Sequence, residues 1–147
     1  MELNRLKHIE AVAQLMKNLA PELGLDEYEM YVLGFVHDVG YEINIHAHAE
    51  AGAQILEDDG YKYAYAVKSH GSPFADFNDP VVWLLNYCDM SIDGKGQLVF
   101  FKRRLKDIKE RHGENSEAYK NSKLVIEKLK ENYKLKARVT LDEELES

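Results

Sequence analysis

Apolar positions recur about every 3.6 residues along most of the chain, and this spacing predicts helices rather than strands. The first predicted helix ends at Pro21, since proline does not continue a helix. Its inward stripe has four members: His8, Val12, Leu15 and Leu19. The second predicted helix begins at Asp26, a favoured capping residue, and reaches Gly40. Its stripe holds Met30, Leu33 and His37. Both helices therefore turn a histidine inward.

The same spacing predicts three more helices in the middle of the chain. They cover about 48–59, 61–70 and 80–94, and the last opens at Asn78 or Asp79 before Pro80. Their predicted inward stripes follow in order: His48, Gly52, Ile55 and Leu56; Tyr63, Val67 and His70; Val82, Leu85 and Asp89. Asp93 before Gly94 is typical of a turn.

The last two predicted helices carry no polar residue on their inner stripes. One stripe holds Leu98, Phe101, Leu105 and Ile108, and the other holds Tyr119, Ile126, Leu129 and Tyr133. These stripes suit a core or a subunit interface equally, so a homo-oligomer stays open. We expect one all-α domain over 1–147, a helical bundle in which 95–135 forms C-terminal packing helices and 136–147 is an acidic tail.

Composition narrows the classes of function. The chain has 147 residues, 45% of them hydrophobic and 31% charged, which is enough apolar material for a packed core. Its formal charge of −7 argues against binding a nucleic-acid duplex or an anionic membrane surface. No apolar run approaches the ~20 residues of a membrane span, and the single Cys88 cannot form an internal disulfide. We therefore expect a cytoplasmic protein.

Five consecutive predicted helices each place histidine or aspartate where the pattern predicts the core. The residues are His8, His37, Asp38, His48, His70 and Asp89. Any one inward histidine is more often a hydrogen-bonded core residue than a ligand. Burying two carboxylates, however, costs several kcal/mol without a compensating positive charge, and no lysine or arginine falls on these stripes. A bound cation resolves this conflict.

The ligand types limit the identity of the cation. Imidazole nitrogens with carboxylate oxygens suit Fe, Mn, Co, Ni or Zn, whereas calcium prefers oxygen ligands alone. A structural zinc site would use several cysteines, and the chain has one. We expect one or two divalent transition-metal ions in an open, catalytic site. Four residues can hold the first ion: His8, His37, Asp38 and Asp89. His48 and His70 can hold a second, with Asp38 bridging the two.

The spacing of His8, the His37-Asp38 pair and Asp89 resembles the H…HD…D signature of the HD superfamily of metal-dependent phosphohydrolases. His48 and His70 resemble the additional histidines of its two-metal branch. The resemblance implies a helical bundle with the metal at its centre and a metal-activated water that cleaves a phosphate ester or anhydride of a nucleotide-like substrate. Asp38 would then be catalytic, and Glu42 is a candidate acid or base.

Two features separate the chain from known subgroups. Tyr41 stands where cyclic-dinucleotide hydrolases of the superfamily have lysine, and their Gly-Tyr-Pro motif is missing. The glutamate that single-metal nucleotidases carry at that position is also absent.

Local positive charge for a phosphorylated substrate would come from Arg5, Lys68 and Arg104, with Arg103 as a further candidate. Solvated surface positions are the ordinary alternative for each of them. Two alternatives to hydrolysis remain. One is a regulatory HD module that binds a nucleotide or metal without catalysis, and the other is a di-iron oxygenase on the same scaffold.

Overall fold

The computed structural model describes residues 3–42 and 48–135, without the side chains of residues 41 and 42. Within that part the regular elements are helical, apart from one isolated β-bridge between Ile92 and Leu98. They follow in this order: α1 Leu3–Leu19, η1 Ala20–Leu23, α2 Glu27–Val36, η2 Val39–Glu42, α3 His48–Asp58, α4 Ala64–Ser69, α5 Pro80–Ser91, α6 Phe101–His112 and α7 Glu117–Glu131. The predicted all-α, single-domain fold is confirmed.

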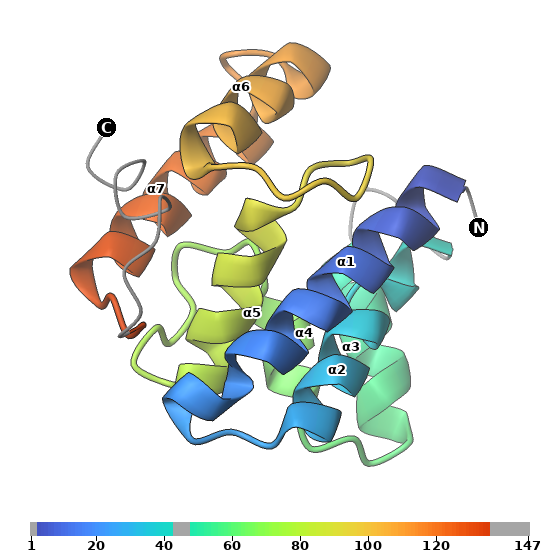
Figure 1. Cartoon of the computed structure of the whole chain (residues 1–147). Coiled ribbons are helices and arrows are strands. Elements are labelled where there is room, and N and C mark those ends of the chain that lie inside the picture. The colour runs from blue at the N-terminus through green and yellow to red at the C-terminus, as the bar shows by residue number, and fades with distance from the viewer. Residues whose placement is uncertain (1–2, 43–47, 136–147) are drawn as a thin grey trace.

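α5 is the central helix of the bundle. Its residues from Val81 to Cys88 are all buried. α1 and α2 pack on one side of it, and α6 and α7 lie together on the other (Figure 1). The indole of Trp83 stacks on Tyr87 with ring centroids 4.9 Å apart and donates a hydrogen bond to the Leu129 carbonyl of α7. The core therefore surrounds the helix that carries Asp89.

Capping side chains start the helices where the sequence predicts. The carboxylate of Asp26 accepts a 2.8 Å hydrogen bond from the Glu29 amide, and that of Asp79 accepts one of 2.8 Å from Val81. α2 ends at Val36 rather than continuing to Gly40. His37 and Asp38 consequently lie just beyond the helix, where the backbone turns into η2.

Some predicted inward positions were wrong. Leu98 is 60% exposed because it belongs to the turn after α5 and not to α6. Ile55 is exposed because α3 buries Gly52 and Ala53 instead. α4 begins at Ala64 rather than Tyr61, and α5 stops at Ser91 rather than at Gly94.

Within residues 3–42 and 48–135, no helix combines the length and the apolar character that crossing a membrane requires.

Candidate metal centre

All six residues predicted as metal ligands converge beside the C-terminal half of α5. They come from five elements: His8 from α1, His37 and Asp38 from the end of α2, His48 from the first turn of α3, His70 from the end of α4, and Asp89 from the last turn of α5. The site is therefore assembled by tertiary packing.

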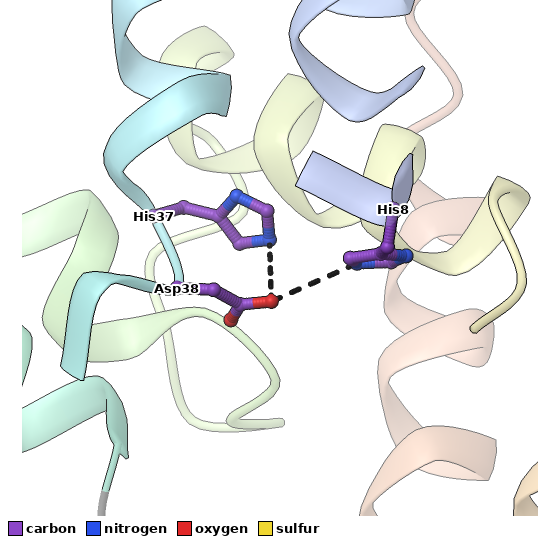
Figure 2. A group of neighbouring side chains, drawn as sticks. All are labelled: His8, His37 and Asp38. Carbon is purple, nitrogen blue, oxygen red and sulfur yellow. Dashed lines mark ion pairs between the residues drawn. The ribbon is translucent and has the colours of Figure 1, made fainter. Parts of the chain in front are cut away.

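One half of the cluster joins the beginning of the chain to α5. Oδ1 of Asp89 lies 2.9 Å from Nε2 of His8 and 3.4 Å from Nε2 of His37. Oδ2 of Asp38 lies 3.8 Å and 3.4 Å from the same two nitrogens. Figure 2 shows His8, His37 and Asp38 pointing toward one another. Two imidazoles and two carboxylates therefore face a common point.

The other half uses the second oxygen of Asp38. Oδ1 lies 3.5 Å from Nε2 of His48 and 3.4 Å from Nε2 of His70. These two nitrogens are 3.1 Å apart. Asp38 thus divides its two oxygens between two pairs of histidines, as a bridging carboxylate does.

Backbone carbonyls orient three of the imidazoles. Nδ1 of His37 donates to the Gly34 carbonyl at 2.6 Å, and Nδ1 of His70 donates to the Val67 carbonyl at 2.5 Å. Because a carbonyl only accepts, each Nδ1 carries a hydrogen and Nε2 is the atom left for a ligand role.

His8 is oriented by a distant turn. Its Nδ1 donates to the Asp93 carbonyl at 2.9 Å. The Asp93 carboxylate accepts hydrogen bonds of 2.9 Å from the amides of Lys95 and Gln97, as predicted for a turn residue. A Cβ at Gly96 would lie 2.7 Å from the Lys7 carbonyl oxygen, so the turn rests directly on α1.

The cluster is electrostatically incomplete. His37 and Asp38 are buried, and Nε2 of His37 has no hydrogen-bond partner. Burial alone would lower the pKa of His37, but the Asp38 and Asp89 carboxylates raise it to about 9. Burial opposes ionisation of the two aspartates as well, yet the neighbouring histidines hold their pKa values below the ordinary range. Without a metal ion, the positive charge beside these carboxylates comes from protonated imidazole and from Arg5, whose guanidinium lies 3.0 Å from Oδ2 of Asp38.

The residues fit a metal ion. Three groups place single nitrogen or oxygen atoms within 4.8 Å of one another: His8, His37 and Asp38; His37, His70 and Asp89; Asp38, His48 and His70. A divalent ion would use the unpartnered His37 nitrogen and supply the charge that protons otherwise provide.

A cavity of about 510 Å³ opens onto the cluster. Arg5, Lys68 and Arg104 all line it, together with five of the six cluster residues. A guanidinium nitrogen of Arg5 lies 3.0 Å from Oδ2 of Asp38, and Nε of Arg104 donates to the Asp89 carbonyl at 3.4 Å. Arg103 lines a different pocket. The side chain of Glu42 lies outside the described residues.

Asn86 is a residue that sequence reasoning missed. It is buried one turn before Asp89; its side-chain oxygen accepts a 2.8 Å hydrogen bond from the Gly71 amide, and its nitrogen donates to the Val82 carbonyl at 2.9 Å. It therefore ties the backbone next to His70 to α5. The available signal was an amide inside the apolar run 81–88, where a buried polar group needs partners.

Gly40 and Gly52 set the distance between η2 and α3. A Cβ at Gly40 would overlap the His48 carbonyl oxygen and lie 2.6 Å from the Gly52 amide nitrogen. A Cβ at Gly52 would lie 3.0 Å from the Gly40 nitrogen. The two glycines thus allow the backbone that carries Asp38 to touch the first turn of α3, which carries His48.

The sequence model of one protein family, described as the HD domain, matches residues 5–143 of the chain. No curated protein and no solved structure gives a significant match.

Proposed function

This chain belongs to the HD domain family, whose members are largely metal-dependent phosphohydrolases, and we propose that it hydrolyses a phosphate ester or anhydride of a nucleotide-like substrate. The observation that carries the proposal is the shared carboxylate of Asp38. Its two oxygens face two separate pairs of histidines at 3.4–3.8 Å. That arrangement suits two divalent ions about 3.5–4 Å apart, as in many phosphoryl-transfer sites.

Divalent ions bound here would lower the pKa of a coordinated water and offset the negative charge of a phosphoryl group. The chain supplies the ligand atoms: Nε2 of His8, His37, His48 and His70, and the carboxylates of Asp38 and Asp89. Backbone hydrogen bonds to three of the imidazoles hold those nitrogens in place. Such orientation lowers the cost of forming the reactive geometry.

Basic side chains on the cavity wall are the proposed binding groups for the phosphate of the substrate. Arg5 lies 3.0 Å from the carboxylate of Asp38, Arg104 donates to the backbone carbonyl of Asp89, and Lys68 precedes His70 by two residues. Their cations would bind phosphoryl oxygens and neutralise charge in the transition state. Water attacks phosphorus, the bond to the leaving oxygen breaks, and that oxygen takes up a proton. Glu42 stays a proposed acid or base on the strength of its sequence position.

Cavity residues beyond the cluster fit a nucleoside. Phe74 is 90% exposed and borders the cavity, so its ring is available to stack on a base. Asn121 and Ser122 of α7 border the same cavity and offer hydrogen-bond donors and acceptors. The volume of about 510 Å³ lies in the usual range of small-molecule sites.

The test is phosphate release by metal-loaded protein from nucleoside mono-, di- and triphosphates, with metal content measured in parallel. We expect release from at least one of them, and its loss with the metal in Asp38→Ala. Asp59→Ala is the matched control, because Asp59 is an exposed carboxylate outside the cavity.

Three outcomes would contradict the proposal. Asp38→Ala with unchanged metal content and turnover would refute the site. Nucleotide binding without cleavage would favour a regulatory module. The spectroscopic signature of a mixed-valent iron pair, with inert phosphate esters, would favour an oxygenase.

A further inference from the structure

We propose that α6 carries a second phosphate-binding position, formed by Arg104 and Arg111, so that the substrate is a nucleoside diphosphate or triphosphate rather than a monophosphate. The inference rests on the proposed function, because it concerns the same cavity. It goes further by assigning a role to Arg111, a residue that the sequence pattern did not single out.

The two arginines are drawn together by one carboxylate. Oδ2 of Asp107 lies 3.4 Å from a guanidinium nitrogen of Arg104 and 3.8 Å from one of Arg111. Arg104 and Arg111 are seven residues apart, which places them two turns apart on one face of α6. Asp107 stands between them at i+3 and i−4, the spacing at which helical side chains meet. The two guanidinium groups therefore converge.

The pair begins beside the metal centre and extends away from it. Nε of Arg104 reaches the backbone carbonyl of Asp89, and its side chain is only 13% exposed. The side chain of Arg111 is 49% exposed and borders the same cavity. A phosphate at the cluster would consequently have Arg104 as its neighbour, and a second phosphate would meet Arg111.

Charge in the cavity supports an extended anion. Apart from the five cluster residues that line it, its wall includes four Lys or Arg side chains (Arg5, Lys68, Arg104 and Arg111) against two Glu side chains (Glu50 and Glu117). The chain as a whole has a formal charge of −7, so this wall is locally of the opposite sign. Arg5 already stands at the cluster, 3.0 Å from Asp38. Arg104 and Arg111 add two cationic groups to the one that Arg5 places at the cluster.

Guanidinium groups suit this task because each offers a planar fork of donors that matches phosphate oxygens. Two converging guanidinium groups can both donate hydrogen bonds to the oxygens of one phosphate. Asp107 keeps the forks ordered before the substrate arrives, which reduces the entropy lost on binding.

The experiment compares Arg111→Gln with Lys109→Gln in metal-loaded full-length protein. Lys109 is an exposed base on the same helix outside the cavity, so its replacement removes the same charge elsewhere. The readouts are kcat/KM for ADP and AMP, and the dissociation constant of the α,β-methylene analogue of ADP by calorimetry.

We expect the wild-type protein to prefer ADP over AMP. Arg111→Gln should lower kcat/KM for ADP and the affinity for the analogue by about tenfold, the effect of one charge-assisted contact at a part-exposed site. Lys109→Gln should stay within about twofold of wild type, because long-range charge effects are screened.

Equal losses in the two variants would overturn the inference, since they would show a general electrostatic effect. A wild-type preference for AMP would overturn it as well. If the wild type cleaves no nucleoside mono-, di- or triphosphate, the proposed function fails. The calorimetric comparison then decides the binding position by itself: a selective loss of affinity in Arg111→Gln supports it, and unchanged affinity refutes it.

Discussion

Replacing Gly40 with alanine tests how finely the cluster is positioned. A Cβ there would overlap the His48 carbonyl oxygen and lie 2.7 Å from its carbon and 2.6 Å from the Gly52 nitrogen. Unstrained contacts of this kind lie near about 3.5 Å, and the overlap with the carbonyl oxygen is the tightest of the three contacts, so α3 has to retreat by more than about 1 Å. Metal–ligand distances tolerate only about 0.2 Å. His48 would therefore leave the ligand set.

The other half of the cluster should survive, because His8, His37 and Asp89 come from α1, α2 and α5. We expect the number of bound ions to fall from about two to about one, with the affinity of the remaining ion within about threefold of wild type. Stability should fall by about 1–3 kcal/mol, the usual cost of overpacking. Metal analysis after dialysis and urea unfolding measure the two effects.

Gly52→Ala provides the matched control. Its Cβ would meet the Gly40 nitrogen at 3.0 Å and a Val39 methyl at 3.1 Å, so the displacement is only about 0.5 Å. Gly52→Ala should therefore lose a smaller fraction of the second ion than Gly40→Ala does. Two ions bound with wild-type affinity in Gly40→Ala, or a larger effect in Gly52→Ala, would refute the reasoning.

Three further predictions concern the same cluster. His48→Ala should reduce the bound ions from about two to about one by metal analysis; an unchanged number would place the second ion elsewhere. Asn86→Leu leaves the Gly71 amide without its hydrogen-bond acceptor, so the free energy of unfolding in urea should fall by about 1–3 kcal/mol. The affinity for the second ion should fall more than the affinity for the first. Equal losses of affinity would contradict a role of Asn86 through His70. Because the pKa of His37 is raised from its ordinary value of 6.5, its protonation stabilises the metal-free fold fully at pH values below 6.5. This contribution is lost as the pH rises through about 9. Urea unfolding of metal-free protein at pH 6 and pH 9 should show the decline, and equal stabilities would contradict it.

Local signals in the sequence were sufficient to predict most of the fold. Asp26 and Asp79 are capping residues before apolar-periodic segments, and both cap helices in the structure. Five of the six inward histidines and aspartates could be predicted because each shares a stripe with apolar residues, and Asp38 directly follows one of them in the chain. His8 and Asp89, 81 residues apart, meet because their stripes face the same core.

Features that depend on how elements approach one another could not be predicted. Leu98 fits the spacing of a helix but lies in a turn that pairs with Ile92. Arg111 looks like an ordinary surface base until Asp107 and the cavity wall are placed. The contact of Gly40 with α3 is likewise invisible in the sequence, because a glycine carries no periodic signal of its own.

The turn after α5 shows why loop length matters for this protein. Surface turns usually accept insertions and deletions, because little depends on their exact path. Here the Asp93 carbonyl sets the ring of His8, and Gly96 touches the backbone of Lys7. An inserted residue would therefore change the orientation of the His8 imidazole on α1, although no side chain of the turn is itself a candidate ligand. Substituting a solvent-facing residue of this turn should therefore disturb the metal centre far less than changing the length of the turn.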